Sequence, residues 1–290
     1  MKLTKIAKVE SGQDIAVFGG YLFDFVAHGV CLGEVSVYDL EKLKNALGCE
    51  PEPLCRFILG GVEKIIPHAN AVFFSDEYYK EGDEFPILYA NVYNTYQKCA
   101  ERHEGELLAY RIKREEFKFF AELVQVIKIG FTENLNLWKS VEGNGDLRPY
   151  GNFTFDKDSH SLYAFVMRDG PHTSRYFKFK HPSVFEGEYS DKYGAKLKVL
   201  NECDIESYFD TDYHKGIQGA VVQNGKIYSL EGGLCEYPAA IRIINPESER
   251  LEFFFEFGAL GVYDEPEGID FSDGVCYYVC GEGDTYILEF

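Results

Sequence analysis

The chain has 290 residues, of which 48 are acidic and 29 are basic, so its formal net charge is −19. Binding to nucleic-acid phosphates or to an anionic membrane depends on Lys and Arg, so this charge argues against both kinds of partner. The acidity itself serves solubility. Aromatic residues make up 16% of the chain, and this excess favours β-strands.

The N-terminal sequence and the cysteines indicate in which cellular compartment the protein is expected. Lysines lie near the start, but no apolar run of the signal-peptide type follows them, and no stretch is long enough to span a bilayer. The eight cysteines form no Cys-x-x-Cys pair. Cys276 and Cys280 lie on one face of a strand-like segment, too far apart for an easy disulfide. We therefore expect a cytoplasmic protein with reduced cysteines.

A short pattern recurs along the chain in five copies. Each copy opens with polar and small residues, runs into a hydrophobic strand, turns at a tight corner, and returns as an aromatic strand. The openings are Gln13-Asp14, His68-Ala69-Asn70, Tyr150-Gly151-Asn152, Gln218-Gly219 and Glu267-Gly268.

The first two copies are predicted as follows. Lys2–Glu10 precedes the first copy, whose strands are Ile15–Phe18, Tyr21–Val26 and Glu34–Tyr38, with a Gly19-Gly20 corner and a short helix over Asp39–Gly48. The second copy has the strands Ala71–Phe74, Ile87–Val92, Glu106–Ile112 and Glu122–Ile129, with a surface insertion at Ser75–Glu84.

The last three copies repeat this plan. The third has the strands Phe153–Phe155, Leu162–Met167 and Arg175–Phe179, followed by an irregular stretch, Ser190–Tyr213, with room for an extra strand pair. The fourth has Ala220–Val222, Lys226–Leu230, Ala240–Ile244 and Leu251–Phe257, and the fifth has Ile269–Phe271, Val275–Cys280 and Thr285–Phe290. Asn224-Gly225 and Asp273-Gly274 are typical tight-hairpin corners.

Repeated units of up to four short antiparallel strands indicate an all-β fold, the β-propeller. The last copy has room for only three strands, and Lys2–Glu10 can supply the fourth, so we expect the two ends to meet in one sheet and close the ring. We predict five blades in a single domain over residues 1–290. The long intervals between copies leave room for a sixth blade.

The polar openings are the predicted site. Inner strands of a propeller begin around one mouth of the central channel. Convergent polar groups on a rigid scaffold are typical of a ligand site. The same groups could instead bond to backbone of neighbouring blades. The residues concerned are Gln13, Asp14, His68, Asn70, Tyr150, Asn152, Gln218, Glu265 and Glu267.

Motifs for covalent chemistry are missing from the sequence. It has no Gly-x-Ser-x-Gly elbow and no phosphate-binding loop. The oxygens of Asp14, Asn70, Asn152 and Glu267 would suit Ca²⁺ or another divalent ion. An alternative is therefore a metal-assisted hydrolase in which His68 acts as general base.

Residues 205–290 carry a resemblance to known propellers. Glu265-Pro266-Glu267-Gly268, followed by a strand and with Gln218-Gly219 one blade earlier, resembles the teichoic-acid-biosynthesis-protein-C-type and phage-tail-receptor-type propellers. More distantly, it is similar to the gluconolactonase/senescence-marker propellers. The resemblance to the lactonases implies a divalent metal held by channel Glu, Asn and Asp residues, and Glu267 alone matches that motif here.

Three functions are left open by these patterns. The first is a cytoplasmic binding module that meets a small molecule or a protein partner at the polar mouth. The second is a metal-dependent hydrolase or lactonase with its site in the channel. The third is a protein-interaction scaffold that uses the insertions at Ser75–Glu84 and Ser190–Tyr213.

Overall fold

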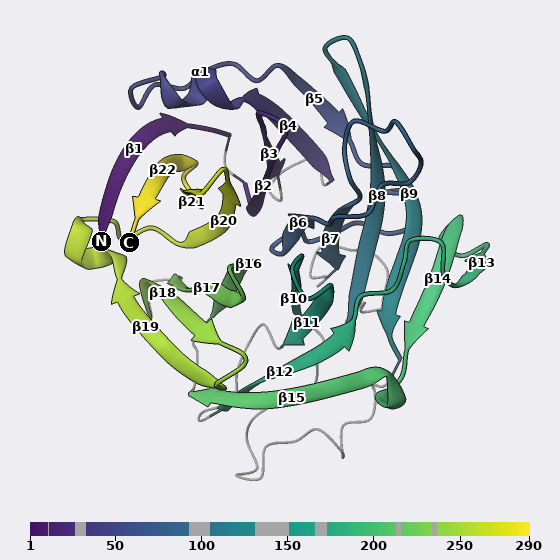
Figure 1. Ribbon diagram of the computed structural model, residues 1–290. Helices are drawn as coiled ribbons and strands as arrows, with labels where there is room; N and C mark the ends of the chain where they lie inside the picture. The colour runs from purple at the N-terminus through teal and green to yellow at the C-terminus, as the bar shows by residue number, and fades with distance from the viewer. Residues whose placement is uncertain are drawn as a thin grey trace.

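The computed structural model describes residues 1–10, 12–26, 33–92, 105–130, 151–165, 173–212, 216–233 and 237–290. Within these ranges the strands form five small sheets that stand in a ring around a common centre (Figure 1). The protein is therefore a five-bladed β-propeller, as predicted, and the sixth blade that the long intervals allowed is not formed by these residues.

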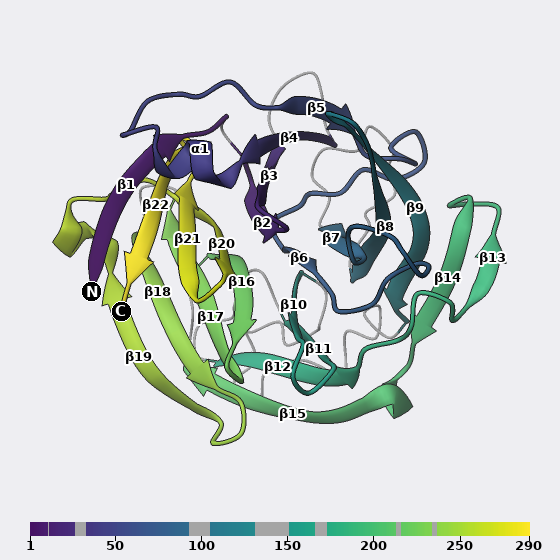
Figure 2. The same ribbon diagram turned by 45° about the horizontal axis from the view of Figure 1, so that its top comes forward.

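Each blade is a mainly antiparallel sheet whose first strand faces the centre (Figures 1 and 2). Blade 1 comprises β2 (Asp14–Phe18), β3 (Tyr21–Val26), β4 (Glu34–Asp39) and β5 (Cys55–Ile58). Blade 2 comprises β6 (Val72–Phe74), β7 (Leu88–Val92), β8 (Glu106–Glu115) and β9 (Lys118–Ile129). Blade 3 comprises β10 (Asn152–Asp156), β11 (Ser161–Phe165), β12 (Thr173–Lys180) and β15 (Ile205–Asp212).

Blades 4 and 5 complete the ring. Blade 4 comprises β16 (Ile217–Gln223), β17 (Lys226–Gly233), β18 (Tyr237–Asn245) and β19 (Arg250–Glu256). Blade 5 comprises β20 (Pro266–Ser272), β21 (Val275–Cys280), β22 (Asp284–Glu289) and, from the other end of the chain, β1 (Lys2–Lys8). β1 pairs antiparallel with β22, and the two termini lie side by side (Figure 1). The predicted ring closure is confirmed.

The tight corners have the backbone that their dipeptides favour. Both residues of each corner are left-handed, with φ of 59° and 83° at Gly19 and Gly20, and 51° and 75° at Asp273 and Gly274. Two successive positive φ angles match the twist of an antiparallel hairpin. These corners could be located from the sequence because few residues other than Gly, Asn and Asp adopt that conformation readily.

Besides the blade strands, the structure has one short α-helix, two 3₁₀ segments and one strand pair that extends the sheet of blade 2. The predicted helix forms as α1 (Leu40–Lys44), where the Asp39 carboxylate caps the helix by accepting from the Lys42 amide at 2.9 Å. β13 (Glu188–Ser190) ends where the predicted irregular stretch begins, β14 (Ala195–Leu200) forms within that stretch, and β14 pairs in parallel with β9. The two 3₁₀ segments are η1 (Glu202–Asp204) and η2 (Phe257–Leu260).

Aromatic side chains fill the space between adjacent blades. Phe23 of blade 1 packs edge-on against Phe74 and Phe119 of blade 2, with ring centroids 5.2 and 5.7 Å apart. Cys276 and Cys280 are buried and unbridged, as predicted. No described helix has the length and apolar character needed to cross a bilayer.

Candidate functional site: the channel mouth and two adjoining clefts

Asp14 lies at the centre of the mouth and joins three blades. Its carboxylate is fully buried and accepts the amides of Ile15 at 2.8 Å, Val72 at 3.0 Å and Ile269 at 3.3 Å. A Cβ on Gly268 would lie 2.6 Å from Asp14 Oδ1. The Gly of that opening is therefore needed because the carboxylate lies directly against the backbone of β20.

Amide side chains of the predicted set link blade 1 to blade 5, blade 5 to blade 4, and blade 4 to blade 3. Gln13 Nε2 donates to Glu267 Oε2 at 2.9 Å, and Gln218 Nε2 donates to Glu265 Oε1 at 2.5 Å. Asn152 Nδ2 donates to the Gln218 carbonyl. The structure thus brings these five side chains together around one mouth.

Asn91 provides the hydrogen bonds between blades 3 and 2, and no motif in the sequence marks this residue. Its Nδ2 donates to the Gly151 carbonyl at 2.7 Å and to Asn70 Oδ1 at 3.1 Å. The His68 amide donates to the Asn91 carbonyl at 3.0 Å. Together with the bond from Val72 to Asp14, hydrogen bonds now run through all five blades. Tyr150, the remaining predicted residue, lies outside the described ranges.

Burial raises the pKa of the carboxyl groups around this mouth. The pKa of Asp14 lies well above its usual value because the side chain is desolvated. The pKa of Glu267 is raised in the same way, and the nearby Glu265 and Asp14 add to it. Burial also raises the pKa of Asp270 to about 6, although its two oxygens accept the amides of Val17 and Phe271.

Asp24, on β3, is a buried acid that no sequence pattern singled out. It is fully buried, and neither of its carboxylate oxygens has a hydrogen-bond partner among the described residues. Burial, followed by the charge of Glu10, raises the pKa of Asp24 well above its ordinary value. A buried acid in such a setting is expected to hold its proton at neutral pH.

These raised pKa values predict an unusual pH dependence of stability. A carboxyl whose pKa is higher in the folded state binds more protons there, so its contribution to stability is lost as pH rises through that folded pKa. For Asp270 the loss falls between about pH 4 and pH 6, and for Asp14, Asp24 and Glu267 it extends to higher pH. We expect the free energy of unfolding to be greater at about pH 6 than at about pH 8.

Urea denaturation across this pH range checks the prediction, with Asp24→Asn as the diagnostic variant. The amide has the same shape but does not titrate, so the variant should show a shallower pH dependence by up to about 1.4 kcal/mol per pH unit. It should also gain stability at about pH 8. Parallel pH profiles for the wild type and Asp24→Asn would contradict the assignment.

The oxygens proposed for a metal are already used by protein donors. Glu267 Oε2 accepts from Gln13, Asn70 Oδ1 accepts from Asn91, and both oxygens of Asp14 accept backbone amides. In the part of the chain that the structure describes, no group of three or more His, Cys, Asp and Glu side chains is placed to hold a metal ion. A Ca²⁺ ion takes six to eight oxygen ligands, so these oxygens would have to exchange their protein donors for the ion before such a site could form.

Two clefts open beside blade 5, next to the mouth. The first, of about 570 Å³, lies between blades 5 and 1, and the second, of about 520 Å³, lies between blade 4 and the η2 segment that leads to blade 5. Both volumes fall within the range of small-molecule sites. The first is lined in part by Lys8, Glu10, Tyr38, Arg56, Gly281 and Glu282, and the second in part by Gly233, Tyr237, Glu256 and Tyr263.

Glu265 connects the two clefts with the mouth. Its carbonyl accepts the amide of Gly281 in the first cleft at 2.9 Å. A Cβ on Gly233 in the second cleft would lie 2.5 Å from Glu265 Cγ. Gly281 also lies against Glu267, whose Oε1 would be 3.3 Å from a Cβ at that position. The mouth carboxylates therefore stand between the two clefts.

The first cleft carries more acidic groups than basic ones. Arg56 donates to both carboxylate oxygens of Glu10, at 3.0 and 3.1 Å from Nε, and this bond lowers the pKa of Glu10. Lys8 lies 3.7 Å from Glu50. Arg56 also lies 3.9 Å from Glu52, so the two basic residues of the cleft face three of its four acids. With Glu282 as the fourth acid, four carboxylates against two cations leave the wall of the cleft negative.

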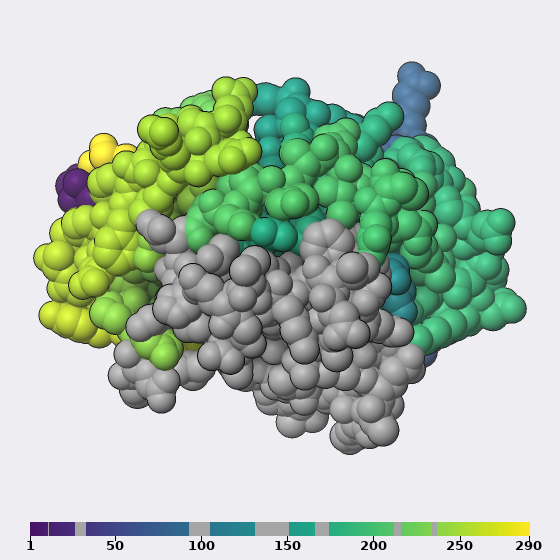
Figure 3. All heavy atoms as spheres, turned by 90° about the horizontal axis from the view of Figure 1, so that it is seen from below, coloured from purple at the N-terminus to yellow at the C-terminus, as the bar shows by residue number. Residues whose placement is uncertain are grey.

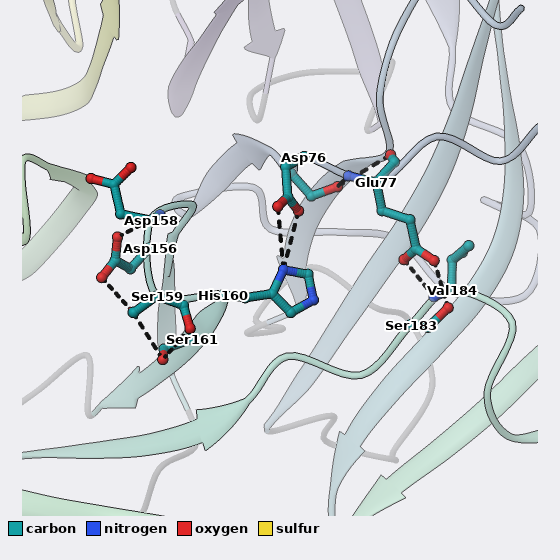
Figure 4. A network of polar contacts seen from close by, with 10 residues as sticks. Asp76, Glu77, Asp156, Asp158, Ser159, His160, Ser161, Ser183 and Val184 are labelled. Atoms are coloured by element: carbon teal, nitrogen blue, oxygen red, sulfur yellow. Dashed lines mark hydrogen bonds and ion pairs between the residues drawn. The ribbon is translucent and has the colours of Figure 1, made fainter. Parts of the chain in front are cut away.

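A second polar network joins blades 2 and 3 away from this mouth, at the corner between β10 and β11 (Figure 4). Nδ1 of His160 lies 3.3 Å from the Asp76 carboxylate, and Glu77 accepts the Val184 amide at 2.8 Å. Burial lowers the pKa of the adjacent His181 to about 3, so its ring is neutral. The insertion predicted at Ser75–Glu84 therefore anchors two blades to each other.

The chain was compared with protein families, curated proteins and solved structures. No family model matches the chain, and no curated protein matches it. Among solved structures, it is similar to a proposed oxidoreductase (glucose dehydrogenase) of Thermus thermophilus, with 10% identity and a TM-score of 0.45, over 99% of this chain and 98% of that one. A proposed 6-phosphogluconolactonase of Bacteroides uniformis is 15% identical, with a TM-score of 0.37, over 92% and 62% of the two chains.

Hydrazine synthase of Kuenenia stuttgartiensis is 12% identical, with a TM-score of 0.42, over 92% of this chain and 61% of that one. This chain thus spans about three fifths of the length of that structure and of the Bacteroides one. At these identities the likenesses concern the fold and carry no activity over to this chain.

Proposed function

We propose that this propeller is a binding module whose small-molecule or protein partner presents ammonium or guanidinium groups to the mouth and to the cleft between blades 5 and 1. The observation that supports this best is the acidic wall of that cleft, where four carboxylates, those of Glu10, Glu50, Glu52 and Glu282, face only the two cations Arg56 and Lys8. Opposite charges favour and steer such an encounter.

The same charge supports the rest of this proposal. A net charge of −19 repels nucleic acids and anionic membranes. Five unbridged cysteines among the described residues are compatible with a cytoplasmic location, which we include in the proposal. A role like that of the teichoic-acid-C-type or phage-tail-receptor-type propellers agrees with a binding function. The metal-dependent hydrolase has less support, because the oxygens that would hold its ion are bonded to protein donors.

Titration calorimetry with spermidine and with a Lys/Arg-rich peptide tests this function. The variant Glu52→Gln/Glu282→Gln should bind about tenfold more weakly, since two exposed charge contacts are worth up to about 1 kcal/mol each. The matched control is Glu247→Gln/Glu249→Gln, which removes the same charge at the exposed corner between β18 and β19. If both double variants lose the same affinity, binding follows net charge alone and the cleft is not the site.

A further inference from the structure

A row of polar side chains crosses blade 1 on the side that faces blade 5. Asp24 of β3 pairs with Ser36 of β4, and Ser36 pairs with Arg56 of β5, in two regular antiparallel ladders. Directly opposite residues in such ladders lie on the same face of the sheet. Leu22, two residues before Asp24 and so on this face, belongs to the same buried cluster as Tyr277 of blade 5. The three polar side chains therefore stand in a row between the two blades.

Glu10 links the outer end of this row to the first cleft. It follows β1, the strand that brings the N-terminus into blade 5, and the purple and yellow ends of the chain lie side by side at the molecular surface (Figure 3). The Glu10 carboxylate accepts from the Ser36 hydroxyl and from Arg56, and the Glu10 amide donates to the Tyr38 hydroxyl at 3.0 Å. Glu10, Tyr38 and Arg56 all line the cleft. The row thus runs from the wall of the cleft inward to Asp24.

Asp24, at the inner end of the row, has no donor for its carboxyl oxygens. The residue is fully buried, and neither oxygen accepts a hydrogen bond from a described residue. A Cβ on Gly12 would lie 2.0 Å from Asp24 Oδ1, so the backbone at Gly12 lies directly over the carboxyl. A buried carboxylate without a donor or a cation is costly, so the empty cleft favours the neutral acid. The raised pKa of Asp24 agrees with this.

The charged and titratable groups around Asp24 and the cleft come from β4, β5, blade 5 and the link before β2. Among the described residues they are Tyr38, Arg56, Lys8, Glu282 and Glu10. Arg56 already donates to Glu10, at 3.0 Å from Nε, so the row itself has no unpaired cation. A partner that brings a positive charge to the cleft would supply one, and an opposite charge favours the ionised form of a nearby carboxyl.

We propose that a cationic group seated in the cleft between blades 5 and 1 ionises Asp24 and drives its proton out to solvent. This inference rests on the function proposed above and adds a proton-linked control of the same site. The O–H bond of the carboxyl breaks, its electron pair stays on the carboxylate, and the proton passes to the buffer. Ser36 and Glu10 lie between Asp24 and the cleft along this path. Because a proton is released on binding, binding strengthens as pH rises.

Titration calorimetry with a short arginine peptide, acetylated and amidated at its ends, tests this proposal. Guanidinium groups do not titrate near neutral pH, so a proton that moves belongs to the protein. Titrations at about pH 7.5 in two buffers of different ionisation enthalpy should differ in heat, and the difference gives the number of protons released, up to about one per site. Between about pH 6.5 and pH 7.5 the dissociation constant should fall by up to about tenfold.

Asp24→Asn is the diagnostic variant, and Glu267→Gln is its matched control, because Glu267 is another buried acid with a raised pKa. Asp24→Asn should bind the peptide without the buffer-dependent heat and without the rise of affinity with pH. Glu267→Gln should keep both. A second measurement needs no variant: in the wild type, the infrared band of protonated carboxyl groups should weaken when the peptide is added.

The outcomes separate this inference from the proposed function. Binding with equal heats in the two buffers, or with an unchanged infrared band, would overturn the inference and leave the proposed function standing. If the peptide does not bind at all, the proposed function fails and the inference fails with it. Proton release that survives in Asp24→Asn, or that is lost only in Glu267→Gln, assigns the proton to another acid and also overturns the inference.

Discussion

Replacement of Asp14 by Ala is expected to destabilise the fold by about 3 kcal/mol or more. The carboxylate accepts three buried amides, from Ile15, Val72 and Ile269, which belong to blades 1, 2 and 5. Each buried donor left without an acceptor costs about 1–3 kcal/mol. Removing a desolvated acid returns part of this free energy, so the net loss lies toward the lower end of the sum.

Urea denaturation at neutral pH measures this loss. Asp14→Asn should fall between the wild type and Asp14→Ala, because its single carbonyl oxygen keeps some of the acceptors while its amide group faces N–H donors. Asp191→Ala, at an exposed position in the β13–β14 corner, is the control and should change stability by less than about 0.5 kcal/mol.

The Asp14 variants also separate the two interpretations of the polar mouth. If Asp14→Ala unfolds at much lower urea, the residue acts as a bond between blades. An Asp14→Ala variant that keeps its full stability yet loses affinity for a cationic probe would instead assign Asp14 to ligand binding. The hydrogen bonds of Asp14 favour the first result, and they leave Glu265 and the adjoining clefts as the part of the site open to a partner.

Local sequence rules were sufficient for most of the fold. Val275–Cys280 was predicted from its apolar and aromatic run after an Asp-Gly corner, and it coincides with β21. The outer strands β5 and β15 were missed for a physical reason. β5 has only four residues, includes the charged Arg56, and follows no tight corner of the kind that marked the other strands. Such strands form because a neighbouring strand offers free backbone groups, which a single segment does not reveal.

The site was predicted in outline only, because its bonds join residues far apart in the sequence. Convergence of the openings followed from the propeller architecture, but the partner of Gln13 is Glu267, 254 residues away. Asn91 belongs to the hydrogen-bond network around the mouth but lies on the second strand of its blade, where no sequence pattern marks a polar residue. The cleft between blades 5 and 1 combines residues from both ends of the chain, so it exists only after the ring has closed.

Closure of the ring by β1 is expected to have the second large effect. Deleting residues 1–8 removes the buried side chains of Ile6 and Ala7 and the whole ladder from Lys2–Glu289 to Lys8–Asp284. Loss of a large buried aliphatic side chain alone costs about 2–5 kcal/mol. We expect the melting temperature to fall by about 10 °C or more, and the truncated chain to associate, because β22 then has an uncovered edge.

A synthetic peptide of residues 1–10 should reverse both effects. A peptide that binds only the folded state stabilises it in proportion to the logarithm of its concentration, so the melting temperature should rise with each addition. A peptide of the same composition in scrambled order is the control, because it lacks the residue order that buries Ile6 and Ala7 and places Lys5 beside Asp284. Two results would contradict this role of β1: a truncated chain with the same melting temperature as the full-length protein, or equal stabilisation by the scrambled peptide. In either case, pairing with β22 is not what holds the ring closed.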